Sequence, residues 1–183
     1  MKDYLSSCKR QFEYYKSLGD KTFEQLMDEQ LSWKPSEGSN SIGTLVKHMH
    51  GNMLSRWTNF LTEDGEKEWR KRDEEFENDI ATREELMTKW EEGWKCLFDA
   101  IDPLTEADLN TEIYIRNMGH SVVEAINRQV SHYAYHVGQI VFMGKLAAED
   151  NWQSLSIPKG ASKEYNSEKF SKPKRREHFT DDL

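Results

Sequence analysis

The clearest structural signal in the sequence is SVVEAINRQVSHYAYHVGQIVFMGKLAA, residues 121–148. Its apolar residues recur every three or four positions, a spacing that places them on one face of an α-helix. They are Val122, Ala125, Ile126, Val130, Tyr133, Val137, Ile140 and Val141. The stretch therefore predicts a long amphipathic helix whose apolar face packs against other helices.

Three more segments show helical periodicity, and no segment repeats another at a fixed interval. They cover about residues 3–18, 41–60 and 82–101. Gly19 is expected to end the first helix, and Asn40 or Ser41 can cap the start of the second. Thr82 followed by Glu85 is typical of a capping box, so we expect the third helix to begin there.

The connectors after the first two helices are long. Residues 20–40 contain one or two helical turns and then a Pro/Gly/Ser loop, and the charged residues 66–79 predict an exposed linker anchored by Trp69 and Phe76. A short extended stretch, EIYIR at 112–116, predicts a small β-hairpin before the last helix. Together these elements predict an all-α fold, a four-helix bundle with long connectors and one hairpin.

Length and charge limit the classes of protein. The 183 residues predict one domain over 1–183, of which about 151–183 is a polar C-terminal segment. A net charge of −8 argues against nucleic acid and anionic membrane surfaces as partners. No stretch is apolar enough for a membrane span or a signal-peptide core, so we expect a cytoplasmic protein.

A pair of histidines in HYAYH, His132 and His136, carries the strongest chemical signal. Residues four apart on a helix share one face, so the two imidazoles can bind one metal ion. A zinc peptidase of the HExxH class has Glu directly after the first His, where this chain has Tyr133, and that chemistry is disfavoured. Spacing alone is equally compatible with two polar groups at the margin of a packed face.

A third ligand has two candidates on the second helix, His48 and His50. At about 100° per residue, His48 lies about 120° to one side of the apolar stripe and His50 about 70° to the other. His132 and His136 lie on the same rotational side of their stripe as His48 does. Antiparallel neighbouring helices therefore select His48, whereas parallel helices select His50.

Three segments carry a resemblance to a known family: SNSIGTLVKHMHGNMLSRWTNFL (39–61), SHYAYHVGQIVFMGK (131–145) and SLSIPKGAS (154–162). They resemble a subfamily of the DinB/YfiT-like superfamily of bacterial metal-binding four-helix bundles, from the first helix to about Asn166. The resemblance implies a divalent metal, usually zinc or nickel, held by His48, His132 and His136 with water completing the shell. The chain departs from the pattern in offering His50 beside His48.

The resemblance also implies an activity. Three neutral imidazoles suit zinc, nickel or iron(II) and leave open coordination positions. Characterised members include thiol transferases that use bacillithiol or mycothiol, so we expect a transferase that joins a low-molecular-weight thiol to a small electrophile. The alternatives are a metal-dependent hydrolase and a non-catalytic metal-binding or stress-response protein. Relatives often dimerise, so a homodimer is expected as well.

Neighbours of the three histidines are further candidates. Asn52 and Arg56 follow His48 at four-residue steps and share its face. Arg56 suits a carboxylate or phosphate of a small substrate, or else pairs with a carboxylate of the chain itself. Gln139 can orient a metal-binding histidine without binding the metal itself. Residues 154–160 either fold over the site as a lid or seal the end of the bundle.

Overall fold

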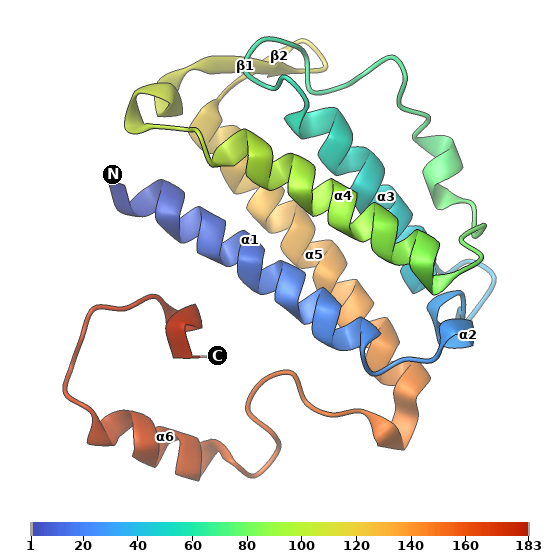
Figure 1. Ribbon diagram of the computed structural model, residues 1–183, viewed down its shortest axis with the longest axis vertical. Helices are drawn as coiled ribbons and strands as arrows, with labels where there is room; N and C mark the ends of the chain where they lie inside the picture. The colour runs from blue at the N-terminus through green and yellow to red at the C-terminus, as the bar shows by residue number, and fades with distance from the viewer. Residues whose placement is uncertain (1, 183) are drawn as a thin grey trace.

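Four long helices pack side by side in the computed structural model, which describes residues 2–182 (Figure 1). They are α1 (Lys2–Phe23), α3 (Ile42–Trp57), α4 (Arg83–Ile101) and α5 (Val122–Ala148). α3 packs chiefly on α4 and α1 on α5, while α3 and α5 run antiparallel through the bundle. The short elements are α2 (Asp28–Leu31), η1 (Asp73–Phe76), η2 (Glu106–Asn110), β1 (Glu112–Ile115), β2 (Met118–Ser121), η3 (Glu149–Asn151), α6 (Ser162–Ser171) and η4 (Phe179–Asp182). The predicted all-α fold with one small hairpin is confirmed.

Side-chain caps begin three of the long helices. The hydroxyls of Ser41, Thr82 and Ser121 accept hydrogen bonds from backbone N–H groups three residues later, at 3.0, 3.1 and 3.2 Å. Each cap satisfies an N–H group that has no partner within its helix. The predicted starts near residues 41 and 82 are therefore confirmed, as is the helix over 121–148.

The first helix is longer than predicted, because Gly19 does not end it. α1 continues to Phe23, and a Cβ added at Gly19 would overlap the indole ring of Trp90 on α4. Gly19 thus allows a close approach between the two helices. Phe23 is 2% exposed and packs edge-on against Trp90. Burial of such a side chain is worth about 1.5–3 kcal/mol, more than the roughly 1 kcal/mol that a helical glycine costs.

The hairpin is tied to the segment that follows α3. β1 and β2 pair antiparallel around a two-residue turn, Arg116–Asn117, in which both residues have positive φ angles of 57° and 59°. Such a turn matches the twist of the paired strands. The Asp64 carboxylate accepts the backbone N–H groups of Arg116 and Asn117, both at 2.8 Å. These bonds hold Arg116 beside the end of α3.

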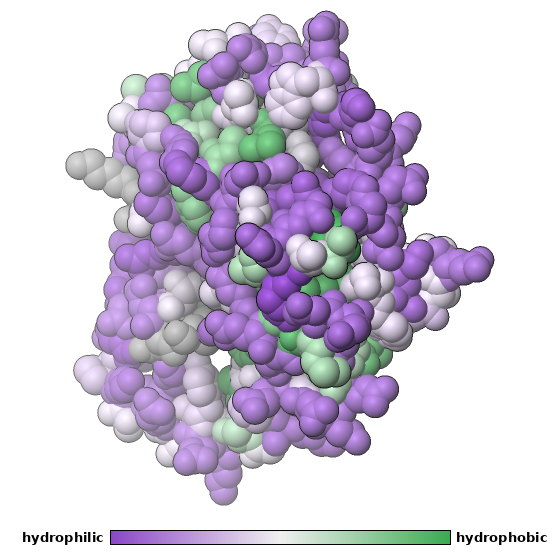
Figure 2. All heavy atoms as spheres, turned by 45° about the vertical axis from the view of Figure 1, so that its right-hand side comes forward, coloured by the Kyte–Doolittle hydropathy of each residue, from purple (hydrophilic) through white to green (hydrophobic). Residues whose placement is uncertain are grey.

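Aromatic rings fill the centre of the bundle. Phe12 on α1 lies 6.5 Å from Trp57, 6.4 Å from Trp94 and 5.9 Å from Tyr133 between ring centroids, and all four residues are buried. The face seen in Figure 2 is mainly hydrophilic, with hydrophobic side chains in small groups. Within residues 2–182, none of the helices combines the length and apolarity that a membrane crossing requires.

Candidate metal centre

Three histidines from two helices converge on one point. His48 comes from α3, and His132 and His136 come from adjacent turns of α5. One ring nitrogen of each lies within 4.8 Å of the others, and the Nε2 atoms of His132 and His136 are 3.0 Å apart. The antiparallel packing of α3 and α5 produces this arrangement, as the rotational positions of the side chains predicted.

Each of these rings has its Nδ1 atom against a side-chain oxygen. The pairs are His48 with Glu75 at 2.9 Å, His136 with Gln139 at 2.9 Å and His132 with Gln129 at 3.4 Å. An oxygen acceptor favours the proton on Nδ1 and leaves the lone pair on Nε2. All three Nε2 atoms are then available as ligands of the same ion.

This donor set fits a divalent metal ion. Two imidazole lone pairs that face each other at 3.0 Å repel unless a proton or a cation lies between them. Zn–N bonds of about 2.0–2.1 Å at tetrahedral angles place neighbouring ligand nitrogens about 3.3–3.4 Å apart. The 3.0 Å between the Nε2 atoms of His132 and His136 is close to that separation, so a small movement of the two rings lets them share one metal ion.

Burial keeps two of the histidines neutral. It lowers the pKa of His132 from 6.5 to about 3, with further lowering by His136, His48 and nearby arginines. It lowers the pKa of His136 to about 4, and proximity to His48 adds to the effect. Neutral imidazole is the form that binds metal, so both side chains are ready for binding at neutral pH.

Glu75, in η1, holds His48 in place. Its carboxylate also accepts two hydrogen bonds from Arg70, at 2.7 and 2.9 Å, and the residue is 6% exposed. Burial alone raises the pKa of Glu75, but the hydrogen bonds from His48 and Arg70 outweigh it and leave the pKa below its usual value. Gly51 makes room for this carboxylate, because a Cβ there would overlap it.

The prediction of an exposed linker over 66–79 is wrong for the residues of this segment that contact the histidine site. The Arg70 side chain is 2% exposed, and Glu75 is buried as well. Trp69 is 56% exposed and does not act as an anchor, whereas the ring of Phe76 stacks on His48 at 4.9 Å. The segment therefore forms one wall of the histidine site. Its contacts with His48 join residues far apart in the sequence, and such contacts leave no periodic pattern.

A cavity of about 440 Å³ opens beside the histidines, and His48 and His132 line it. The predicted neighbours Asn52 and Arg56 line it too. Asn52 is 4% exposed and accepts a hydrogen bond from Tyr133 at 3.1 Å. That bond occupies the amide oxygen of Asn52 and leaves its NH₂ group for the cavity.

Arg56 pairs with a carboxylate of the chain itself, one of the two alternatives that its position in the sequence allowed. Its Nη1 atom donates to the Glu66 carboxylate at 3.2 Å and to the carbonyl oxygen of Gly65.

Tyr133 is wholly buried and accepts a hydrogen bond from Trp57 at 3.0 Å. Tyr133 thus belongs to the core and fixes Asn52 from there.

His50 lies outside the cluster. It faces α4, where its Nε2 atom is 3.2 Å from the Glu92 carboxylate. The lid, one of the two alternatives for residues 154–160, does not form over the site: Leu155, Ile157 and Pro158 line a separate cavity with Tyr14 and Lys21 of α1. These apolar side chains lie beside α1 instead.

Sequence reasoning missed several residues of the cavity. They are Arg70, Arg72, Arg116, Arg128 and Gln129. The spacing that identified Asn52 and Arg56 would have found Arg128, because it precedes His132 by four residues on α5. Arg70, Arg72 and Arg116 come from non-helical segments, and only the tertiary fold brings them here.

The comparisons with known proteins identify a family for this chain. No curated protein matches the chain. A family model described as "Protein of unknown function (DUF1572)" matches residues 1–161, which include all four long helices and the three clustered histidines. The chain belongs to the DUF1572 family of proteins of unknown function.

Proposed function

We propose that this protein is a divalent-metal-dependent enzyme that transfers a low-molecular-weight thiol to a small electrophile. The observation that carries the proposal is the cluster of three imidazoles, each with Nδ1 within hydrogen-bond distance of a side-chain oxygen and with one ring nitrogen within 4.8 Å of those of the other two. The resemblance of residues 39–61 and 131–145 to DinB/YfiT-like proteins, which include thiol transferases, supports the same conclusion.

His48, His132 and His136 would hold zinc or nickel, and their nitrogen donors also suit iron(II). Three protein ligands are typical of catalytic metal sites, which keep at least one position for water or substrate. A metal ion in such a site lowers the pKa of a bound thiol or water toward neutrality. The cavity beside the histidines gives a small substrate access to that position.

The surrounding residues have supporting roles in this proposal. Glu75 and Arg70 hold the His48 ring in the orientation that presents Nε2. The buried hydrogen bond from Tyr133 fixes Asn52, so the Asn52 NH₂ group can donate to a substrate oxygen in the cavity. Asn52 would orient the substrate, whereas Glu75 and Arg70 orient a metal-binding histidine. The proton of a thiol acidified by the metal ion would pass to bulk water.

A thiol-transfer assay tests the proposal. Zinc- or nickel-loaded protein is mixed with bacillithiol, mycothiol or cysteine and a panel of electrophiles, and loss of free thiol is followed. We expect transfer with at least one thiol, its loss in His132→Ala, and its retention in His50→Ala, because His50 faces Glu92 rather than the cluster. Metal-loaded protein that is inactive with every thiol would contradict the transferase proposal, and thiol-independent hydrolysis would replace it with a hydrolase.

A further inference from the structure

Five arginines line the cavity beside the histidines. They are Arg56, Arg70, Arg72, Arg116 and Arg128. They come from α3, the segment after it, the hairpin turn and α5, so the fold gathers them from across the sequence. Within the described part of the chain, no Asp or Glu lines this cavity. The cavity is therefore lined by positive charge, although the whole protein has a net charge of −8.

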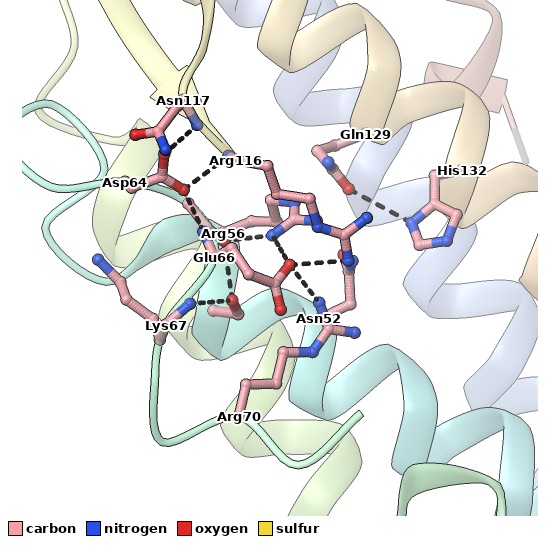
Figure 3. A network of polar contacts seen from close by, with 12 residues as sticks. Asn52, Arg56, Asp64, Glu66, Lys67, Arg70, Arg116, Asn117, Gln129 and His132 are labelled. Atoms are coloured by element: carbon pink, nitrogen blue, oxygen red, sulfur yellow. Dashed lines mark hydrogen bonds and ion pairs between the residues drawn. The ribbon is translucent and has the colours of Figure 1, made fainter. Parts of the chain in front are cut away.

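Carboxylates behind the arginines neutralise only part of that charge. Figure 3 shows Glu66 among Arg56, Arg70 and Arg116, at 3.2, 3.6 and 3.1 Å between charged atoms. Glu75 is the second carboxylate, and it pairs with Arg70. Asp64 is the third, because it lies close enough to Arg56 for the two charges to interact. Three carboxylates thus stand against five guanidinium groups. The Glu66 contacts also show that the cluster can surround one oxyanion from three sides.

Arg56 retains an unused hydrogen-bond donor. The residue is 7% exposed, and its buried Nε atom has no hydrogen-bond partner. A buried donor of a charged group without an acceptor is costly, and native structures seldom keep one without a reason. Arg128, which also lines the cavity, is exposed to solvent.

We propose that this arginine cluster binds the anionic group, a carboxylate or a phosphate, of the substrate that reacts at the histidine site. The planar guanidinium fork matches both groups and binds them through paired hydrogen bonds. The cavity volume of about 440 Å³ suits a small molecule. The proposal rests on the proposed function, because His48 and His132 line the same cavity as the arginines.

Calorimetric titration of metal-free protein with inorganic phosphate and with succinate tests this proposal. We expect saturable binding of at least one anion at low ionic strength and none of choline, a cation. Arg128→Gln and Arg116→Asn should each weaken binding by about tenfold, since one charge-assisted hydrogen bond is lost. Asn also tolerates the positive φ of 57° at residue 116. Circular dichroism verifies that each variant folds.

Lys145→Gln is the matched control, because it removes one exposed positive charge from α5 about 25 Å from Arg128. Its affinity should equal that of the wild-type protein. Tighter binding of phosphate than of succinate identifies a phosphate group, and the reverse identifies a carboxylate.

Three results would overturn the proposal: no anion binding, equal affinity in the arginine variants, or binding that appears only after metal loading. The titration uses metal-free protein, so its result is independent of the proposed metal chemistry. If the protein binds anions but no metal, the proposed metal-dependent enzyme is refuted, whereas the anion-binding site is retained.

Discussion

Two histidines two positions apart on α3, His48 and His50, have different surroundings. His48 faces α5, where its ring lies 4.8 Å from His136 and 5.6 Å from His132 between centroids. His50 faces α4 and contacts Glu92. A two-residue step on a helix turns the side chain by about 200°, which accounts for the difference.

We predict that His48→Ala removes stable metal binding and that His50→Ala does not. The first change deletes one of three ligands, whereas the second deletes a contact with a carboxylate on α4. Elemental analysis of protein purified with added zinc should give about one ion per chain for wild type and His50→Ala and close to none for His48→Ala. Loss of metal in His50→Ala alone would show that the wrong histidine has been assigned.

Gly51 gives a second prediction, because its missing Cβ is what admits the Glu75 carboxylate. We predict that Gly51→Ala weakens metal binding about 10–100-fold, the range seen when a hydrogen-bond partner of a ligand is lost. A competition titration with a chromophoric chelator measures the affinity. Gly138→Ala on α5 is the control, since nothing lies within 4 Å of a Cβ there. Unchanged affinity in Gly51→Ala would mean that Glu75 does not orient His48.

The site could be predicted where helical spacing decides it. His132 and His136, and Asn52 and Arg56 behind His48, follow from four-residue steps. Glu75 could not be predicted in this way. It lies in a charged segment without periodicity, and its burial depends on Arg70, His48 and the gap at Gly51.

At the scale of elements, the α3–α5 pair makes the site. The sequence predicts both helices because each has a serine cap and an apolar face. It leaves their relative direction open, and the antiparallel packing seen in the structure is what selects His48 over His50. Gly19 shows where such prediction fails. Local propensity predicts that the helix ends there. The helix instead continues to Phe23, because Gly19 contacts Trp90 and Phe23 is buried.

The clustered histidines of α5, of which His136 is buried and His132 half-buried, predict how stability depends on pH. In the unfolded chain they gain protons near pH 6.5, whereas in the folded chain the pKa values are about 3 for His132 and about 4 for His136. The unfolded state therefore binds more protons between these values. The free energy of unfolding of metal-free protein should be highest above pH 6.5 and fall as the pH drops toward 4.

Urea denaturation at several pH values measures this dependence. The variant His132→Gln/His136→Gln is the control, since its remaining acid sensitivity comes from other groups. We expect a smaller decrease between pH 6.5 and 4 in the variant than in the wild type. Equal slopes would show that these two histidines are not held neutral by the fold.

For the whole molecule, the core is sufficient without metal. Large buried side chains such as Phe12, Trp90, Trp94 and Tyr133 contribute about 1.5–3 kcal/mol each, and the bundle contains many of them. We predict that chelated protein keeps its helical circular dichroism signal at 25 °C. Metal at a hundredfold excess over its dissociation constant adds about 2.7 kcal/mol, which should raise Tm by roughly 5–10 °C. Loss of the helical signal on chelation would indicate a structural metal site.

We claim that the three histidines form an open metal site that accepts a thiol. X-ray absorption spectroscopy at the zinc edge identifies the ligands of that site and so tests this claim. We predict three imidazole nitrogens at about 2.0–2.1 Å and an oxygen ligand in the resting protein. Added thiol should replace that oxygen with a sulfur at about 2.3 Å. A zinc shell filled by four protein ligands, or one that gains no sulfur from any thiol offered, would contradict the claim.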